Sequence, residues 1–545
     1  MTVLAPYRSS VAPARPPGFR SLLLAEWTKL RTVRGFIVAL LLIVLLPVGV
    51  TLLSHSECSI GNGSGQSFAC PAAPVGPDGE AVDDNFYFVH QSLPAGGSIT
   101  VQVTGLTGQY NAPAGNRVRV GQQSPLVPGI QPWSKAGIMI KASTRQGSAY
   151  AAMLVTGSNG TRMQWDYTGD TAGLSGDVSA SSPRWLRLVR SGSTVTGYDS
   201  LDGATWTEVG HYQVHGLPAS GTVQVGLFAA SPSHTTITES IGNSQGNSSP
   251  ALATGTFADV AVSGTSGSGG WTGTTIGSGT GPAIPGQPAP SGPASVFDGS
   301  YHQGGPAAFT VSGSGEIAPD VPGGPDSIGA SVQVALSGIF IALIVVIILG
   351  ALFVAAEYRR GMIRVTFAAA PSRWKVLAAK SAVLGAATFA ASLIAVGVTL
   401  PLGLHLLRAG GNPIDPIPAL TEARIVVGTA LLLALAAVLA LAIGAMARRS
   451  VVAIVTVIVV IFIPYILVNV ANLLPGATQV WLLRGLPIAA FSIQQPYPAY
   501  HQVATAYTSS NGYYPLSPWA GLGVLLLWAA VALVTASWLL RRRDA

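Results

Sequence analysis

The chain has 545 residues, and its 29 Lys and Arg with its 22 Asp and Glu make up only 9% of them. Soluble globular proteins carry roughly 25% charged residues, so this composition excludes an ordinary cytosolic enzyme. A hydrophobic share of 49% and a mean hydropathy of +0.47 indicate an integral membrane protein. The net charge of +7 comes mostly from basic residues beside apolar runs, which predicts no nucleic-acid partner.

Six runs without Asp, Glu, Lys or Arg are long enough to cross a bilayer, which takes about 20 helical residues. They are residues 35–53, 331–356, 381–407, 425–447, 450–474 and 518–540. One charge at the centre of a span would cost on the order of 3 kcal/mol. The sequence therefore predicts six transmembrane helices, and Trp519 and Trp538 mark the two membrane interfaces of the last one.

The basic clusters set the orientation. If residues 1–34 are cytoplasmic, alternate crossings bring every cluster to the same side: 1–34, 357–380, 448–449 and 541–543. The positive-inside rule then places both termini in the cytoplasm and residues 54–330 outside. Arg exceeds Lys while Ala and Gly are abundant, which indicates a GC-rich bacterial genome and hence a bacterial plasma membrane.

The segment between the first two spans, residues 54–330, is predicted to be an extracytoplasmic domain. Cys58 and Cys70 lie at its start, and two thiols in an oxidising compartment normally pair, so a disulfide is expected within the juxtamembrane segment 54–83. Residues 263–330 are rich in Gly, Ser and Pro and predict a flexible tether that can add edge strands, with one strand-like stretch at 309–311.

Residues 84–262 alternate apolar and polar side chains in short stretches separated by Gly, Asp and Asn: 98–103, 137–141, 185–189, 194–198 and 223–228. Many short strands without helical periodicity predict an all-β sandwich or jelly roll. The expected fold class is therefore a polytopic α-helical membrane protein with an extracytoplasmic β-sandwich inserted between helices 1 and 2.

Four stretches of this domain carry a resemblance: Trp-Ser-Lys-Ala-Gly-Ile-Met-Ile-Lys-Ala-Ser from Trp133, Ala-Tyr-Ala-Ala-Met from Ala149, Trp-Leu-Arg-Leu-Val-Arg from Trp185, and Tyr-Asp-Ser-Leu-Asp-Gly-Ala-Thr-Trp-Thr from Tyr198. They resemble the concanavalin A-like lectin/glucanase sandwiches, a superfamily that includes glycan binders and glycan hydrolases.

The candidate glycan contacts are four tryptophans that could stack on sugar rings or pack in the core: Trp133, Trp165, Trp185 and Trp206. Retaining glycosidases need two carboxylates about 5 Å apart. Asp83 and Asp84 are adjacent, so on a strand they would point to opposite faces. The sequence therefore favours glycan binding or scaffolding over hydrolysis, and it predicts no catalytic residue and no metal site.

Residues 19–34 predict an amphipathic helix that lies in the membrane interface. Its apolar stripe consists of Phe19, Leu22, Leu23, Trp27, Leu30 and Val33. Glu26 projects from the middle of this stripe, where an unpaired carboxylate is costly. We therefore expect Glu26 to pair with Lys29, Arg359 or Arg360.

Two cytoplasmic stretches carry a second resemblance. Leu24-Ala-Glu-Trp-Thr-Lys-Leu-Arg-Thr-Val-Arg precedes the first span; Glu357-Tyr-Arg-Arg-Gly-Met-Ile-Arg-Val-Thr and Pro371-Ser-Arg-Trp-Lys-Val-Leu-Ala-Ala-Lys follow the second. In this order they are similar to the type-2 ATP-binding-cassette (ABC) exporter permeases. Pro371 can open a short helix, and residues 371–380 take the place of that family's coupling helix.

The resemblance implies that the interface helix and the coupling helix dock on ATPase subunits. Carried over by position, the docking residues are Glu26, Trp27, Lys29, Arg31, Arg34, Glu357, Arg359, Arg360, Arg364, Pro371, Arg373, Trp374, Lys375 and Lys380. The family also places short hydrophobic helices before the last span as an outer gate. Residues 480–491 match that place, and a loop helix on the outer leaflet is the alternative.

The chain contains no Gly-Lys dipeptide, so the phosphate-binding motif G-x-x-x-x-G-K-[ST] does not occur in it. ATP and Mg²⁺ are therefore expected in a separate ATPase subunit, with no cofactor in this chain. Six spans are half of the transport path in the family, which implies a second permease copy, most simply a homodimer. The sequence thus predicts an exporter permease with a lectin-like domain; the alternative is a membrane-anchored sensor or cell-wall tether that binds surface glycan without transport.

Overall fold

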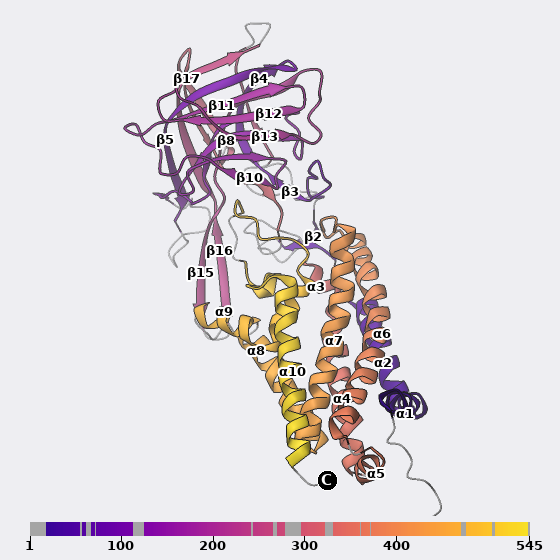
Figure 1. The fold of residues 1–545 in the computed structure, drawn as a ribbon. Helices are drawn as coiled ribbons and strands as arrows, with labels where there is room; N and C mark the ends of the chain where they lie inside the picture. The colour runs from indigo at the N-terminus through magenta and orange to yellow at the C-terminus, as the bar shows by residue number, and fades with distance from the viewer. Residues whose placement is uncertain are drawn as a thin grey trace, which may run out of the picture.

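The computed structural model describes residues 18–54, 57–61, 67–70, 72–112, 125–240, 243–264, 270–277, 296–321, 331–359, 361–370, 372–469, 476–503 and 507–542. A β domain sits at one end of a bundle of long helices (Figure 1). We call this end of the bundle the sandwich side. The opposite end, where the N-terminal helix lies, is called the α1 side.

Six of the described helices are long and apolar enough to cross a membrane. They are α2 (Arg34–Leu53), α4 (Ile339–Arg359), α6 (Arg373–Ala409), α7 (Ala419–Ala447), α8 (Ser450–Asn469) and α10 (Pro518–Arg542). Each contains most of one predicted run, although α6 begins before the predicted residue 381 and residues 470–474 of the fifth run lie outside the described part of the chain. A separate turn, α3 (Val332–Ala335), precedes α4, and α7 begins before the predicted residue 425 and so includes Arg424.

Helix α7 is the centre of the bundle. Its spanning part is 72% buried inside the protein, whereas that of α2 is 17% buried. Small residues let the helices approach closely: a Cβ at Gly350 of α4 would lie 2.2 Å from the carbonyl oxygen of Ala437 in α7. Such contacts replace the hydrophobic effect, which is weak between helices inside lipid.

The apolar stretch 480–491 divides into two elements. Helix α9 (Gly476–Gly485) is largely exposed, while the 3₁₀ segment η2 (Pro487–Gln494) is buried along its whole length. It packs so closely on α10 that a Cβ at Gly521 would lie 2.1 Å from the carbonyl oxygen of Ala489. The η2 part is therefore inside the bundle and does not lie on the leaflet surface.

The β domain contains two large sheets. One has the order β10-β9-β8-β7-β14-β4-β18, with β10 (Gly169–Ala172), β9 (Thr161–Trp165), β8 (Tyr150–Thr156), β7 (Lys135–Lys141), β14 (Val223–Ala230), β4 (Phe86–Leu93) and β18 (Thr272–Ile276). The other has the order β13-β12-β11-β5-β17-β20-β19, with β13 (Thr207–Gln213), β12 (Thr194–Ser200), β11 (Arg184–Ser191), β5 (Gly96–Asn111), β17 (Ala251–Ser263), β20 (Ala308–Gly313), β19 (Ser300–Gly305), and β6 (Leu126–Pro128) beside β5.

The two sheets share one core, to which β7 contributes Ile138 and Ile140 and β11 contributes Leu186 and Leu188. The intervening Met139 belongs to a second cluster on the other face of its sheet, because successive side chains of a strand point to opposite faces. All five strands predicted from alternation are strands here, in β5, β7, β11, β12 and β14, so the expected β-sandwich is confirmed.

Residues 263–330 add edge strands, as predicted, but they also add an inner strand, so the sandwich extends beyond the expected boundary at residue 262. The segment called a tether supplies β18 to one sheet and β19 and β20 to the other, where β20 lies between β17 and β19. Phe309 and Val311 of β20 are buried in the shared core. The strand-like stretch predicted at 309–311 is part of β20, whereas the Gly-, Ser- and Thr-rich sequences of β18 and β19 gave no comparable signal.

Short elements complete the domain: β1 (Ser59–Gly61) with β2 (Ser67–Ala69), β3 (Val82–Asp84) with β21 (Ile317–Pro319), the hairpin β15 (His234–Ser240) with β16 (Asn243–Ser249), and the turns η1 (Val296–Asp298) and η3 (Ser509–Asn511). A disulfide joins Cys58 to Cys70 across the β1–β2 pair. The backbone N–H of Cys58 donates to the carbonyl of Gly410, at the end of α6. This hairpin is thereby fixed to the sandwich side of the bundle.

Two further contacts hold the base of the sandwich on the helices. The N–H of Ala81, just before β3, donates to Asp415 Oδ1 in the α6–α7 connection at 2.6 Å. Gln502, in the connection between η2 and α10, donates from Nε2 to the carbonyls of Tyr167 and Thr168 at 3.0 and 3.1 Å. Two separate connections on the sandwich side are therefore tied to the same β domain.

The Asp415 contact carries an electrostatic cost. Burial raises the pKa of Asp415 from its ordinary 3.8 to about 7; the Ala81 hydrogen bond lowers this pKa, and the charges of Asp320 and Glu80 raise it. A released Asp415 ionises near its ordinary pKa, so between pH 4 and pH 7 the docked state holds the extra proton. Docking must weaken as the pH rises through this interval and then level off.

We expect hydrogen-exchange protection of the Ala81 amide, corrected for intrinsic exchange, to fall about a hundredfold between pH 5 and pH 8, equivalent to about 2.7 kcal/mol. Asp415→Asn keeps the Oδ1 acceptor but cannot ionise, so its protection should not change with pH. The control Glu422→Gln removes a carboxyl from the first turn of α7 and should behave as wild type. A pH-independent wild type would contradict this assignment.

Candidate functional site at the α1 side

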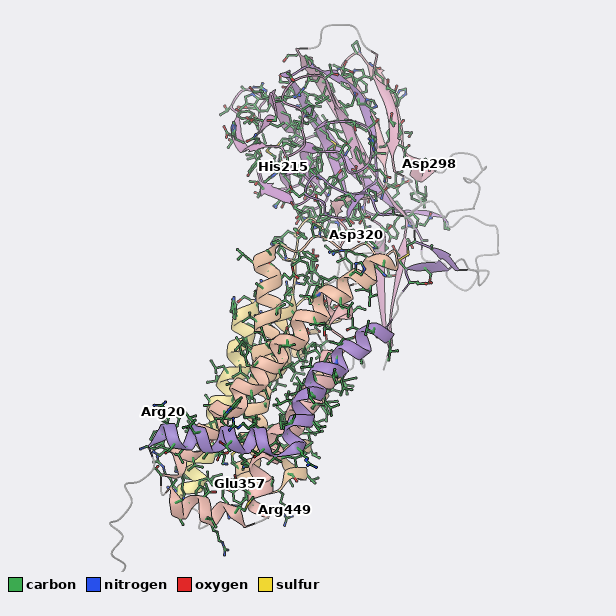
Figure 2. The ribbon with its side chains drawn as sticks, turned by 90° about the vertical axis from the view of Figure 1, so that its right-hand side faces the viewer. Arg20, His215, Asp298, Asp320, Glu357 and Arg449 are labelled. Atoms are coloured by element: carbon green, nitrogen blue, oxygen red, sulfur yellow. A yellow bond between two sulfur atoms is a disulfide. The ribbon has the colours of Figure 1, made fainter. Side chains whose placement is uncertain are left out.

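The N-terminal helix α1 (Phe19–Thr32) lies across the ends of the spanning helices (Figure 2). Only Val33, in an extended conformation, separates it from α2, so the chain bends sharply at this point. Within α1, Glu26 and Leu30 are buried, whereas Phe19 and Trp27 of the apolar stripe are exposed. Most of the stripe is therefore free to contact lipid or another chain.

Glu26 belongs to a buried cluster of four charged side chains, which we call the ion cluster: Glu26 and Lys29 from α1, Glu357 from α4 and Lys380 from α6. Lys380 Nζ lies 2.6 Å from Glu26 Oε1 and 2.7 Å from Glu357 Oε1. Lys29 Nζ bonds the same oxygen of Glu357 and lies 3.8 Å from Glu26 Oε2. The cluster thus joins three helices that are far apart in the sequence.

An aromatic ring forms the apolar floor of the ion cluster. The ammonium groups of Lys29 and Lys380 lie 4.8 and 5.6 Å from the ring centre of Phe353, which also contacts Phe36 of α2 at 5.1 Å. A cation near an aromatic face gains about 1 kcal/mol or more when water is excluded. Helix α2 is thereby connected to the same point.

The four charges of the ion cluster sum to zero, but each of them alone would be energetically costly to bury. Burial, together with the charge of Lys380, lowers the pKa of Lys29, while Glu357 and Glu26 raise it. Two cations and two carboxylates compensate each other; loss of one leaves an uncompensated buried charge. The arrangement therefore favours one relative placement of α1, α4 and α6 over others.

The sequence expected Glu26 to pair with Lys29, Arg359 or Arg360. Lys29 does contact it, but the nearest cation is Lys380. Arg360 and the side chain of Arg359 lie outside the described residues. Lys380 is the last charge before the third apolar run, and a lysine at such a position can extend to the membrane surface. The sequence pattern alone therefore could not distinguish this role from an ion pair with Glu26.

The expected coupling helix also differs from the structure. Pro371 lies outside the described residues, and Arg373–Lys380 forms the first turns of the long helix α6. The separate short helix in this connection is α5 (Met362–Ala369). Helical residues continue without interruption from Trp374 into the apolar run, so no signal ends a helix at Lys380.

The predicted docking residues fall into two groups. Glu26, Glu357 and Lys380 are buried in the ion cluster. An exposed group surrounds it: Trp27 and Trp374, each 46% exposed, with Arg31, Arg34 and Arg364. Half-buried Lys375 lies 5.8 Å from the Trp374 ring, and Arg373 donates to the carbonyl of Leu540 in α10. The buried charges thus fix the segments on which the exposed docking residues lie.

The four candidate glycan-contact tryptophans each contact other residues of the β domain. Arg162 lies over the Trp133 ring, Trp165 stacks on Tyr212 with ring centres 3.5 Å apart, and Arg187 lies 3.9 Å over Trp206. Trp185 packs beside the turn at Gly203, where a Cβ would meet the indole.

Among the described residues, no group of three or more His, Cys, Asp or Glu side chains could hold a metal ion.

The sequence matches the ABC-2 family transporter proteins over residues 21–545, nearly the whole chain, including the β domain. The chain belongs to this family. It is therefore a multi-pass membrane protein and the membrane subunit of an ABC transporter, a family that generally partners with an ATPase subunit. No curated protein matches the chain.

Several solved structures resemble part of the chain. The GH43 BlXynB protein from Bacillus licheniformis is 15% identical over 25% of this chain and 24% of its own, with a TM-score of 0.17. A functionally unknown protein from Saccharomyces cerevisiae is 14% identical over 39% and 95%, with a TM-score of 0.21. Scytalido-glutamic peptidase is 8% identical over 44% and 99%, with a TM-score of 0.22. Similarities this low support no functional conclusion.

Replacing Lys380 tests the ion cluster. Lys380→Met leaves two buried carboxylates facing only Lys29, so we expect a loss of roughly 3 kcal/mol in the free energy of unfolding. The measurement is equilibrium unfolding of the detergent-solubilised protein. Lys375→Met, five residues earlier on α6 and outside the ion cluster, should change it by less than about 0.5 kcal/mol.

A second variant separates charge from packing. Glu26→Gln combined with Lys380→Met removes one charge of each sign, so we expect it to recover part of the lost stability. Equal stability of the Lys380→Met and Lys375→Met proteins would contradict a structural role for the ion cluster.

Proposed function

We propose that this chain is the permease subunit of an ABC exporter whose ATP hydrolysis takes place in a separate subunit, which binds ATP and Mg²⁺. The observation that carries the proposal is the family match over the whole helical part, together with the ion cluster at the α1 side. The cluster joins the two segments that, by resemblance, would receive the ATPase.

Helix α6 provides the mechanical connection. Its 37 residues, at 1.5 Å each, span about 55 Å, from Arg373 at the α1 side to Ala409 beneath the sandwich. A push on the exposed residues around Trp374 would move α6 together with α1 and α4, since Lys380 holds both. The same helix ends next to Gly410, which bonds the β1–β2 hairpin.

The proposed orientation places the α1 side in the cytoplasm and the β domain outside a bacterial plasma membrane, as the basic clusters predict. The ATPase-docking surface then consists of Trp27, Arg31, Arg34, Arg364, Trp374 and Lys375, supported from beneath by the ion cluster. A second permease copy would complete the transport path, and a homodimer is the simplest arrangement.

For the β domain we propose a concanavalin A-like lectin/glucanase fold, supported by the two antiparallel sheets over one core. The internal partners of Trp133, Trp165 and Trp206 favour structural roles for these rings over sugar stacking. The domain's attachment to the α6–α7 and η2–α10 connections favours a role in opening the sandwich side of the bundle.

Co-purification tests the proposal. We expect the full chain, expressed with the genes beside it, to bring down an ATPase with vanadate-sensitive hydrolysis. Trp374→Ala should lower the amount of bound ATPase about tenfold, since a buried interface tryptophan contributes on the order of 1.4 kcal/mol or more.

The matched control is Trp538→Ala. Trp538 is 48% exposed, near the α1-side end of α10, and lies outside both docking segments, so its replacement should leave ATPase binding within about twofold of wild type. Absence of any ATPase, with retention of the chain on cell-wall glycan, would favour the alternative of a membrane-anchored glycan sensor or tether. Equal losses in both variants would remove Trp374 from the docking surface.

A further inference from the structure

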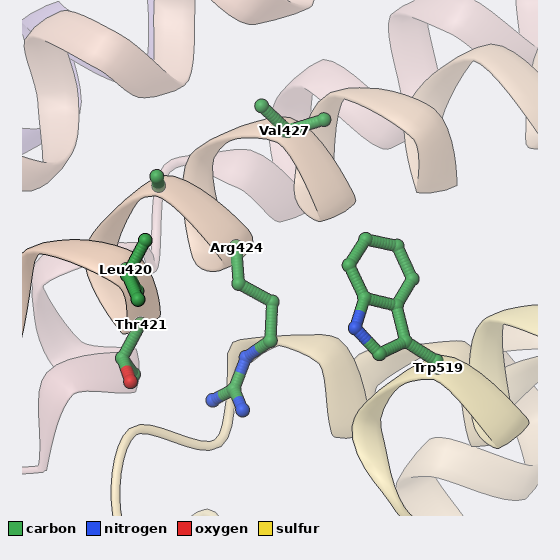
Figure 3. Close-up of a pocket in the computed structure, with 6 residues that line it drawn as sticks. Leu420, Thr421, Arg424, Val427 and Trp519 are labelled. Carbon is green, nitrogen blue, oxygen red and sulfur yellow. The ribbon is translucent and has the colours of Figure 1, made fainter.

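An open cavity of about 470 Å³ lies between the sandwich-side ends of α7 and α10. Its lining consists of Leu420, Thr421, Ala423, Arg424, Val427 and Trp519. Figure 3 shows the Arg424 side chain extending from α7 beside the indole of Trp519 from α10. One cation and one aromatic ring are thus brought together in a largely apolar setting.

Arg424 is not neutralised within the described part of the chain. One Nη2 hydrogen bond goes to the backbone carbonyl of Gln495, and the described ion pairs do not include Arg424. Its Nε is buried and has no hydrogen-bond partner among the described residues. A guanidinium offers five donors in a planar fork suited to phosphate, so most of this capacity is left for a ligand.

The position of the cavity points to lipid. Arg424 and Trp519 lie in the first two turns of two spanning helices, which places them at the membrane boundary on the sandwich side. The exposed fractions of Leu420 and Trp519 are 87% and 56%, so the apolar rim faces away from the bundle. Tryptophan at this depth contacts headgroups and the upper acyl chains.

We propose that this cavity binds the headgroup of an anionic phospholipid, with the phosphate on Arg424 and an acyl chain along Leu420 and Val427 beside Trp519. The charge of the ligand compensates Arg424, and its chain covers the apolar rim. A soluble anion would compensate the charge of Arg424 but would leave the apolar rim uncovered. This site stands apart from the proposed ATPase-docking surface, on the opposite membrane boundary.

Fluorescence quenching in nanodiscs tests the site with the full-length protein. The probes are phosphatidylglycerol and phosphatidylcholine, each brominated on an acyl chain. Subtracting the Trp519→Phe signal isolates quenching at Trp519 from the other tryptophans. In wild type, we expect half-maximal quenching at an about tenfold lower fraction of phosphatidylglycerol than of phosphatidylcholine, about 1.4 kcal/mol, because the choline cation offsets the phosphate charge in phosphatidylcholine and phosphatidylglycerol has no such cation.

Three variants define the role of the charge. Arg424→Gln keeps a donor for Gln495 and should abolish the tenfold preference, while Arg424→Lys should keep most of it. Arg484→Gln is the matched control, because Arg484 is an exposed cation of α9 outside the cavity; it should behave as wild type.

Several results would overturn the proposal. Equal quenching by the two lipids in wild type, or an Arg484→Gln effect as large as that of Arg424→Gln, would show that Arg424 has no specific role. Loss of the preference in Arg424→Lys would indicate a structural role for the guanidinium. Loss of the preference in excess inorganic phosphate would assign the cavity to a soluble anion instead of a lipid.

Discussion

The helical half of this protein depends on the compensation of buried charge. Glu26, Lys29, Glu357 and Lys380 come from three helices and leave no net charge in a site that water hardly reaches. Each charge would be expensive alone, so the alternatives in which α1 slides or α6 rotates are disfavoured. The interface helix, the second span and the third span behave as one unit at this end of the molecule.

The helices meet the sandwich at two connections. Helix α6 leads to Gly410 and Asp415, which bond the β1–β2 hairpin and Ala81. The buried segment η2 leads to Gln502, which bonds the β9–β10 turn. The β domain thus lies across the α6–α7 and η2–α10 connections. A large domain in this place favours control over the sandwich side of the bundle more than simple attachment to its surface.

The sequence predicted more of the fold than of the sites. Uncharged runs located all six apolar helices, because a helix in lipid is apolar on every side. Alternation located strands such as 137–141, because a strand of a sandwich buries one face in the shared core. It failed where composition and burial disagree. Strand β18 has a single large apolar residue, yet it completes one sheet with Ile276 buried. Arg424 was excluded from the predicted fourth span by its charge, although α7 includes it.

The sequence by itself predicted six apolar helices long enough to cross a membrane and a separate β domain, since hydrophobic length and strand alternation are local properties. Only the tertiary structure decided which charges meet. Lys380 is 354 positions from Glu26 along the chain, and no local pattern encodes a contact between helices so far apart. It also decided that Arg424 meets Trp519 at one cavity, because that encounter depends on how α10 packs beside α7.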